Sequence, residues 1–531
     1  MASTARNSLR LSLVTIVSRI TGLVRDHYQA VFFGTGPISA AWEIAYMLPN
    51  MLRNLLAEGV LSQAFVPIYS GSLKESEERA RRTSGVILCY LFFVLLAVVI
   101  LGWITFPFLL PLYTGRTGEE ANLVITLASI LFPFILTTSL ASIYMGMANT
   151  RQSFFIPSLS PVLLNLILIS GFLVLAQLTL DDFSNVKWLA AVTIAGGFAQ
   201  LIFQATHVWK KGWAPRFNLD LKDPALKKIY TLMAPAVIGA SIFQLNQLLD
   251  VAIASYMIPD PGAITGLRFA HRLIQLPTGV IGVALSTAIL PVLARAIRED
   301  KKEEIPHELS HALSFSFFLN VPAGIGLYVL GPDIINLLFF GGDWDLKSTA
   351  ITWAALQFYC IGIPLYSANR IVTSSFYAYE DTKSPVRILI GVVILNFALN
   401  LVLVPHLMQG GLALSTSFCA VVNFAFLYRT LKKHVPSIQL REAVRSILRQ
   451  VPGYLLLVSF LWILSYFRHD LVGLLSQAGI LGSLPGPRQA AWPMVVVGAG
   501  GGGLLYVASG FLFRIPELEF LRRRFGLTSR S

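Results

Sequence analysis

The chain has 531 residues, of which 55% are hydrophobic and only 13% are charged, whereas soluble proteins average about 45 to 50% apolar and about 25% charged residues. This composition excludes an ordinary soluble domain and indicates a polytopic membrane protein. A net charge of +13 also occurs in nucleic-acid-binding proteins, but the placement of the charges described below argues against a nucleic-acid partner.

Fourteen apolar runs are long enough to cross the hydrocarbon core of a bilayer, which takes about 20 mostly apolar residues. They are predicted at residues 9–33, 37–70, 84–112, 121–148, 155–178, 186–209, 227–258, 265–297, 308–330, 348–378, 385–405, 410–431, 448–467 and 491–513. The alternating pattern of a membrane barrel is absent, and helices satisfy their backbone hydrogen bonds internally. The sequence therefore predicts an all-α polytopic membrane protein with about 14 transmembrane helices.

Lysine and arginine concentrate in alternate loops and in both tails, most densely in residues 71–83, 210–228 and 429–449. The intervening loops hold only Arg116, Lys187, Lys347, Arg468 and Arg488. Because cytoplasmic loops carry the excess of positive charge, we expect a multi-pass membrane protein with both termini in the cytoplasm.

The first run carries charges where a membrane helix should carry none. Its sequence SRITGLVRD covers residues 18–26. Positions seven apart return to the same side of a helix within about 20°, so Arg19, Gly22 and Asp26 share one stripe and Arg25 lies about 100° from it. No small-residue cleavage site follows this run, which is therefore expected to stay in the protein rather than act as a signal peptide.

The second run adds further polar groups to the predicted membrane interior. Asn50 and Arg53 lie on one stripe of the helix, and Asn54 and Glu58 lie on another. Glu43 lies nearer the outer end of the same run.

The later runs carry arginine as well. Arg268, Arg272 and Gln275 fall on one face of the eighth run, and Arg370 lies in the tenth. A charge at the bilayer centre costs about 2.5 to 3.5 kcal/mol, so charged residues usually face an internal aqueous cavity. Snorkelling near helix ends is the alternative, above all for Arg268 and Arg370.

Arginine outnumbers acidic residues inside these runs. A guanidinium group offers a fork of donors that matches phosphate or carboxylate oxygens. We therefore predict a cavity for an anionic, phosphate-bearing substrate.

A second polar cluster is predicted in the other half of the chain, from Asp250, Asn396, Asn400 and Thr416. If these helices adjoin, their oxygens could hold a monovalent cation, and transport would be driven by sodium or protons. A hydrogen-bonded contact between helices is the alternative. No other cofactor is expected, and the membrane potential is the other candidate driving force.

The sequence repeats itself weakly. LSQAFVP at 61–67 returns as LSTAILP at 285–291, and at the same spacing Asp26 corresponds to Asp250. With a slightly longer spacing, Asn165 falls near Asn396. This pattern predicts two six-helix lobes that run in the same direction through the membrane, followed by two further helices. The predicted parts are an N-lobe at 1–209, a linker loop at 210–226, a C-lobe at 227–433, and the last two helices with a basic tail at 434–531.

No enzyme is indicated, because the sequence has no HExxH, GxSxG or Walker motif. Cys89, Cys360 and Cys419 each lie inside an apolar run, so no disulfide or metal site is predicted.

Five blocks carry a family resemblance: SRITGLVRD, FFGTG, LPNMLRNLLAEGVLSQAFVP, AHRLIQLPTGVIGVALSTAILP and FYAYEDTKSP. At these blocks the sequence resembles the MurJ/MviN family, the lipid II flippases of the multidrug/oligosaccharidyl-lipid/polysaccharide exporter superfamily. The resemblance covers nearly the whole chain.

This resemblance implies that the protein moves lipid II, the undecaprenyl-pyrophosphate disaccharide-pentapeptide used in peptidoglycan biosynthesis, from the cytoplasmic to the periplasmic leaflet by alternating access. Membrane lipids and the cell-wall synthesis machinery would be its other partners. The last two helices would hold the polyprenyl tail, and the arginines would bind the pyrophosphate. Matched position by position, the implied substrate-binding residues are Ser18, Arg19, Arg25, Asp26, Arg53, Glu58 and Arg272, and we add Glu43, Arg268 and Arg370 as substrate or gate residues.

The chain departs from the family pattern at two places. Many relatives have an aspartate where this chain has Ala40, and Glu43 lies nearly one turn further on. Asn400 stands where some relatives carry an acid. Three alternative functions remain: an exporter of another lipid-linked oligosaccharide or of a drug, a non-transporting cell-wall scaffold, and a membrane-embedded transferase.

Overall fold

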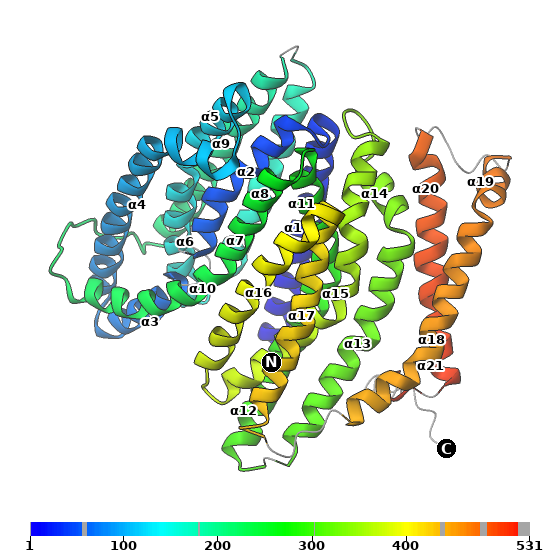
Figure 1. The fold of residues 1–531 in the computed structure, drawn as a ribbon. Helices are drawn as coiled ribbons and strands as arrows, with labels where there is room; N and C mark the ends of the chain where they lie inside the picture. The colour runs from blue at the N-terminus through cyan, green and yellow to red at the C-terminus, as the bar shows by residue number, and fades with distance from the viewer. Residues whose placement is uncertain are drawn as a thin grey trace. The chain divides into compact units, whose positions relative to one another are not determined.

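The computed structural model describes residues 2–55, 61–178, 181–301, 303–435, 441–477, 486–513 and 515–518. Within these ranges the chain is helical almost throughout and contains no strand (Figure 1), apart from one isolated bridge between Gly341 and Trp344. The all-α prediction is confirmed.

Eleven helical segments of the described chain are long and apolar enough to cross a membrane. They are Glu77–Thr114, Gly118–Thr150, Phe155–Leu175, Asp182–Lys210, Gly262–Arg298, Ile305–Val329, Leu346–Ala378, Lys383–Leu407, Gln409–Leu431, Arg441–Tyr466 and Gly486–Leu512. Each coincides with one of the predicted runs, so the chain is a polytopic membrane protein.

The three other predicted runs also lie on helices. Run 9–33 lies on α1 (Ala2–Phe33), run 37–70 on α2 (Pro37–Arg53) and α3 (Leu61–Glu75), and run 227–258 on α10 (Pro224–Met257). Residues 56–60, and with them Glu58, lie outside the described residues. The mean hydropathy of α1 is low because the helix carries three charged residues within about two turns, Arg19, Arg25 and Asp26.

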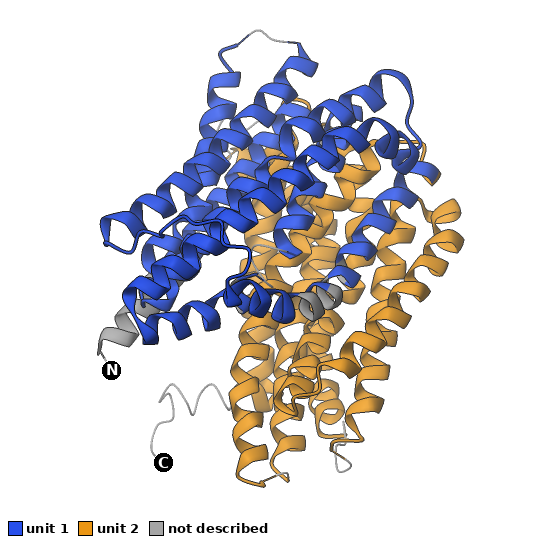
Figure 2. Ribbon diagram, turned by 90° about the vertical axis from the view of Figure 1, so that its left-hand side faces the viewer, with its two compact units in different colours: residues 1–256 blue, residues 257–531 orange. Residues whose placement is uncertain are grey.

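The contacts divide the chain into two compact units, which Figure 2 colours separately: residues 1–256 and residues 257–531. In the first unit α1 packs against α8, and α2 packs against α5 and α6. Besides the helices already named, this unit contains α4 (Glu77–Thr114), α5 (Gly118–Leu131), α6 (Phe134–Thr150), α7 (Phe155–Ser158), α8 (Ser160–Leu175) and α9 (Asp182–Lys210).

The second unit is built around the long helix α15 (Leu346–Ala378), which contacts α11, α12, α13, α14 and α17. The other helices of this unit are α11 (Gly262–Pro277), η2 (Thr278–Gly282), α12 (Val283–Arg298), α13 (Ile305–Val329), α14 (Gly331–Phe339), α16 (Lys383–Leu407), α17 (Gln409–Leu431), α18 (Arg441–Tyr466), α19 (Arg468–Gln477), α20 (Gly486–Val496), η3 (Val497–Gly501) and α21 (Gly502–Leu512). η2 and η3 are single π-helical turns inside longer helices.

α10 is attached to α4 at both ends. Near the start of α10, Tyr230 meets Tyr90 edge to face, with ring centroids 5.4 Å apart. Towards its end, the Tyr113 hydroxyl donates to the Leu248 carbonyl at 2.7 Å, and the Tyr256 hydroxyl donates to the Leu112 carbonyl. The contacts therefore group most of α10 with the first unit, whereas the sequence repeat begins the second lobe at residue 227. The contact-based units and the sequence repeat are different criteria for dividing the chain. The division into two six-helix lobes therefore stays a prediction.

Candidate functional site

A buried ion pair lies on α1. Arg25 Nη2 is 2.6 Å from Asp26 Oδ1, and the two side chains are only 16% and 2% exposed. Arg25 Nη1 also donates to Asn165 Oδ1 of α8 at 3.1 Å. Because removing a partner from a buried charge costs several kcal/mol, these contacts explain how the bundle holds charged residues in the predicted first transmembrane run.

Asn165 ties α8 to two turns of α1. Its oxygen accepts from Arg25, and its Nδ2 donates to the Ser18 carbonyl and to Thr21 Oγ1, both at 3.2 Å. The sequence analysis did not place Asn165 among the site residues. The signal that could have found it was its correspondence with Asn396 in the repeat.

Glu43 belongs to the same charged cluster. It is buried on α2, and Gln29 of α1 donates to its Oε1 at 2.7 Å. Arg25 interacts electrostatically with Glu43 as well as with Asp26. We call Arg25, Asp26, Gln29, Glu43 and Asn165 the Arg25 cluster.

The aspartate expected by resemblance is absent because Ala40 occupies its position, fully buried one turn before Glu43. The structure therefore places an acidic side chain beside Arg25 in spite of that change. Whether Glu43 takes over the role of the missing aspartate stays a prediction.

Arg19 differs from Arg25 in its surroundings. It is exposed and makes no hydrogen bond or ion pair with the described part of the chain, while Ser18 is half-buried. The exposed apolar residues of α1 include Ile16, Ile20 and Val24. At about 100° per residue, Arg19 points about 100° away from the middle of that apolar face and about 20° from the direction of Asp26. The stripe predicted from the sequence is therefore the edge of the packed face rather than the apolar surface.

Arg53 is the last residue of α2 and is half-buried, with its Nη2 3.5 Å from Asn54 Oδ1. One turn earlier, Asn50 Oδ1 is buried and accepts no hydrogen bond from the described residues. Buried acceptors in proteins are normally satisfied by a polar partner, water or ligand. Glu58 cannot be placed beside them, because it lies outside the described residues.

In the second unit, the polar face of α11 turns away from its packed side. Leu273 and Ile274 are buried, whereas Arg268, His271 and Arg272 are half-buried. Because α11 packs against α15, the amphipathic pattern predicted from the sequence is realised in the fold. The Arg268 guanidinium lies over the Phe269 ring, 5.5 Å from its centroid.

Arg370 of α15 lies near the α11 face. It is exposed, and both Arg272 and Arg370 interact electrostatically with His271. His271 packs edge to face on Tyr359, with centroids 5.9 Å apart. The structure thus brings Arg272 and Arg370 to the same histidine.

The predicted cation cluster is only partly assembled in the second unit. Asn400 Nδ2 donates to Asn396 Oδ1 at 3.1 Å, and Ser415 of α17 contacts both asparagines. Thr416 was expected here, but its hydroxyl donates to the Leu412 carbonyl of its own helix. Because consecutive residues of a helix point about 100° apart, Ser415 rather than Thr416 faces the asparagines. These contacts match the alternative reading of a hydrogen-bonded helix pair.

Asp250 lies in the first unit, towards the end of α10. It is half-buried, and Asn246 one turn earlier donates to it at 3.2 Å. Its predicted assembly with the asparagines of α16 stays a prediction.

Comparisons with known proteins agree over most of the chain. A family model described as lipid II flippase MurJ matches residues 29–478. The probable lipid II flippase MurJ of Rhizobium tropici is 31% identical over 484 residues, which cover 88% of this chain and 89% of that protein. The lipid II flippase MurJ of Burkholderia cenocepacia is 32% identical over 460 residues, covering 85% and 86% of the two chains.

Solved structures give the same fold. A lipid II flippase MurJ in an inward closed conformation superposes with a TM-score of 0.77 at 24% identity, covering 95% of this chain and 98% of that one. An inward-facing multidrug resistance transporter of the MATE family reaches a TM-score of 0.66 at 16% identity, over 80% of this chain and 98% of that one. At these identities the structural likeness establishes the fold and not the substrate.

Proposed function

Because the chain belongs to the lipid II flippase MurJ family, we propose that it moves lipid II across the bacterial inner membrane for peptidoglycan synthesis. The observation that carries this proposal is similarity to curated flippases along nearly the whole length of both proteins. The transporter fold is the one expected for alternating access.

In the proposed mechanism, arginines bind the pyrophosphate while the charged head group crosses inside the protein. The Arg25 cluster supports this role, because its arginine is positioned by Asp26 and Asn165 before any substrate arrives. A positioned guanidinium loses less freedom on binding a phosphate than a mobile one does. Arg19, Arg53 and Arg272 are the proposed partners of Arg25. Ser18, Asp26 and Glu58 complete the proposed substrate-binding set, and Glu43, Arg268 and Arg370 are proposed substrate or gate residues.

The proposed orientation has both termini in the cytoplasm, which is supported by the concentration of lysine and arginine in alternate loops. Lipid II would then enter from the cytoplasmic leaflet and leave on the periplasmic side. Contact with the cell-wall synthesis machinery is a further expectation from the family resemblance.

Complementation tests the function directly. The chain should support growth of a strain depleted of its own lipid II flippase, and Arg25→Ala should abolish that growth. Arg116→Ala is the matched control: Arg116 is also buried, but its partner is the exposed Glu120, and this variant should still support growth. Failure of the unmodified chain, with the protein present in the membrane, would contradict the proposal.

The driving force is tested separately. If Asp250 takes part in a sodium or proton site, Asp250→Ala should lower lipid II transport in proteoliposomes and remove its response to an imposed sodium or proton gradient. Transport that responds to the membrane potential alone, in both the unmodified protein and the variant, would exclude the cation site.

A further inference from the structure

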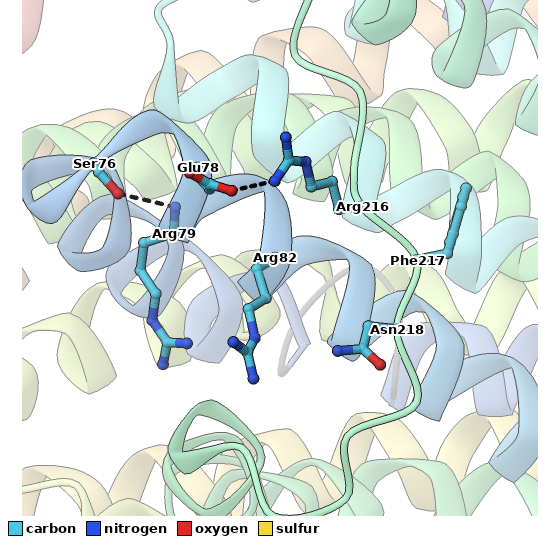
Figure 3. A pocket seen from close by; sticks show the side chains of 7 residues that line it. All are labelled: Ser76, Glu78, Arg79, Arg82, Arg216, Phe217 and Asn218. Atoms are coloured by element: carbon cyan, nitrogen blue, oxygen red, sulfur yellow. Dashed lines mark hydrogen bonds and ion pairs between the residues drawn. The ribbon is translucent and has the colours of Figure 1, made fainter.

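A cavity of about 520 Å³ lies where the linker after α9 crosses the start of α4 (Figure 3). Its walls belong entirely to the first unit. Ser76, Arg79 and Arg82 come from the start of α4, and Arg216, Phe217 and Asn218 come from the linker. Figure 3 shows Phe217 and Asn218 extending to opposite sides of the linker backbone.

One side of the linker is fastened to α4 by polar contacts. Arg216 pairs with Glu78, and its backbone N–H donates to the Arg81 carbonyl at 2.9 Å. Two residues along from Asn218, Asp220 accepts from Arg82 at 2.8 Å. The Lys222 backbone N–H and the Arg82 guanidinium lower the pKa of Asp220 below its ordinary value, so this contact carries full charge at neutral pH.

The last contact of this series fixes the start of α10. Arg79 donates twice to Asp223, at 3.0 and 3.2 Å, and the Asp223 side chain is 1% exposed. The same carboxylate accepts the Ala225 backbone N–H at 2.9 Å. The linker is therefore held in a fixed orientation from residue 216 to the first turn of α10.

The other side of the linker has no cover in the described part of the chain. Phe217, Leu219 and Leu221 are 59%, 53% and 66% exposed. Residues 216–220 have no helix, and in an extended segment alternate side chains point to opposite faces. Arg216 and Asp220 make their polar contacts on one face, so this alternation places Phe217 and Leu219 on the opposite face. Leu221 follows in the turn before α10 and is exposed as well.

Lysines precede and follow this apolar segment in the sequence. Lys210, Lys211, Lys222, Lys227 and Lys228 are all exposed, and none makes an ion pair within the described residues. Apolar side chains beside unpaired lysines are the pattern of a segment that lies in the interface of an anionic membrane, with the apolar groups below the headgroups and the ammonium groups at the lipid phosphates. A cytosolic protein partner would not account for the lysines as directly.

We propose that residues 216–222 anchor the linker in the surface of the cytoplasmic leaflet, through Phe217, Leu219 and Leu221 and through attraction of the neighbouring lysines to anionic phospholipid. The anchor rests on the proposed orientation of the chain and not on the identity of the transported lipid. In this proposal the two faces of the linker make different contacts: the polar face binds α4, and the apolar face binds the membrane.

The test uses the full chain with Cys89, Cys360 and Cys419 replaced by alanine and one new cysteine at a time, at positions 217, 218, 219, 221 and 222. Each variant is labelled with bimane and reconstituted into vesicles of phosphatidylcholine with phosphatidylglycerol. Iodide should quench the probes at 217, 219 and 221 several-fold less than those at 218 and 222, and lipids brominated on the acyl chain should quench them several-fold more. Equal quenching at all five positions would overturn the proposal.

A second set of measurements tests the role of anionic lipid. Leaving out phosphatidylglycerol, or making the triple change Lys222→Glu, Lys227→Glu and Lys228→Glu, should restore iodide access at 219. Lys187→Glu, a single substitution of the same kind at the far end of α9, should not. If residue 219 stays shielded from iodide in pure phosphatidylcholine, the proposed role of anionic lipid is wrong. If it is shielded only in cells, the surface binds a protein partner, and the membrane anchor is overturned.

Sidedness separates this inference from the proposed function. Lys222→Cys in intact spheroplasts should resist a membrane-impermeant maleimide and react after the cells are opened. Reaction from outside would overturn the assignment to the cytoplasmic leaflet, whereas loss of growth support with normal shielding would count against the flippase and leave the anchor standing.

Discussion

Arg25 shows how a single residue can carry charge into a helix that is predicted to lie in the membrane. Its guanidinium is satisfied by the adjacent Asp26 and by Asn165 from another helix. Arg19, less than two turns away, is exposed and has no such partners in the described chain. The two arginines are therefore not equivalent, because Arg25 is held by its partners whereas Arg19 is exposed.

Replacing Asn165 tests this positioning. Asn165→Ala removes one partner of Arg25 and the donor to the Ser18 carbonyl, so unfolding should become easier by about 1 to 3 kcal/mol, the cost of leaving buried polar groups unsatisfied. Thermal unfolding followed by tryptophan fluorescence in detergent measures the change. Gln177→Ala, at an exposed position just after α8, is the control, and equal melting temperatures for both variants would contradict the assignment.

A second stability prediction concerns Asp223 at the end of the linker. Asp223→Asn keeps the size of the side chain but removes the closer of the two carboxylates that pair with Arg79, leaving only Glu75 at 3.9 Å. The expected loss of stability is about 1.5 to 3 kcal/mol, the range for hydrogen bonds to charged groups. The value should stay below that of a fully buried pair, because Arg79 is 29% exposed. The neighbouring Lys222→Gln should leave the melting temperature unchanged. An unaltered melting temperature in Asp223→Asn would show that the pair contributes nothing.

At the scale of elements, close backbone contact decides where the linker can lie. A Cβ atom on Gly85 of α4 would fall 1.8 Å from the Arg216 carbonyl oxygen and 2.3 Å from its carbon. Backbone atoms cannot avoid such a clash by a change of rotamer. The linker therefore depends on a residue without a side chain at this position.

Gly85→Ala should displace the linker from α4 and speed tryptic cleavage at Lys211, Arg216 or Lys222. The readout is the cleavage rate of the reconstituted protein, followed by mass spectrometry. Gly71→Ala is a matched control on α3, because nothing lies within 4 Å of its added Cβ, and alanine favours a helix over glycine by about 1 kcal/mol. An unchanged cleavage rate in Gly85→Ala would mean that the linker does not rest on α4.

The helix pair α16 and α17 gives a second prediction at this scale. Ser415→Ala should lower the melting temperature because it removes the group that contacts Asn396 and Asn400, at a cost of about 0.6 kcal/mol, the average for polar contacts between membrane helices. Thr416→Val should be nearly neutral, because that hydroxyl bonds only within its own helix. If Thr416→Val instead weakens a sodium-dependent stabilisation, Thr416 is a cation ligand after all.

For the whole molecule, the central hypothesis is that several arginines bind the diphosphate of one substrate molecule. Arg25 and Arg272 are two of the arginines proposed for this role. Two groups that hold the same ligand are coupled, with interaction energies of about 0.5 to 3 kcal/mol in double-mutant cycles. Binding of lipid II can be measured by native mass spectrometry in Arg25→Ala, in Arg272→Ala and in the double variant. The loss of binding free energy in the double variant should be smaller than the sum of the two single losses. Strict additivity would indicate separate sites.

The sequence by itself determined the fold class, the eleven helical segments that are long and apolar enough to span a membrane, and the family. Run length, composition and motif blocks are properties of local stretches of chain. The sequence also indicated the polar stripe of α1 and the polar face of α11, because helical periodicity places residues on faces before any packing is known.

The tertiary structure alone decided which groups meet. Asn165 beside Arg25, Ser415 instead of Thr416 beside the asparagines, and α10 fastened to α4 all depend on which helices adjoin and how each is rotated. A helix turns about 100° per residue, so an error of one position sends a side chain to another neighbour. The hydrophobic pattern gives the general direction of a helix face but not its rotation to within one residue. The partners of the buried polar groups fix that rotation.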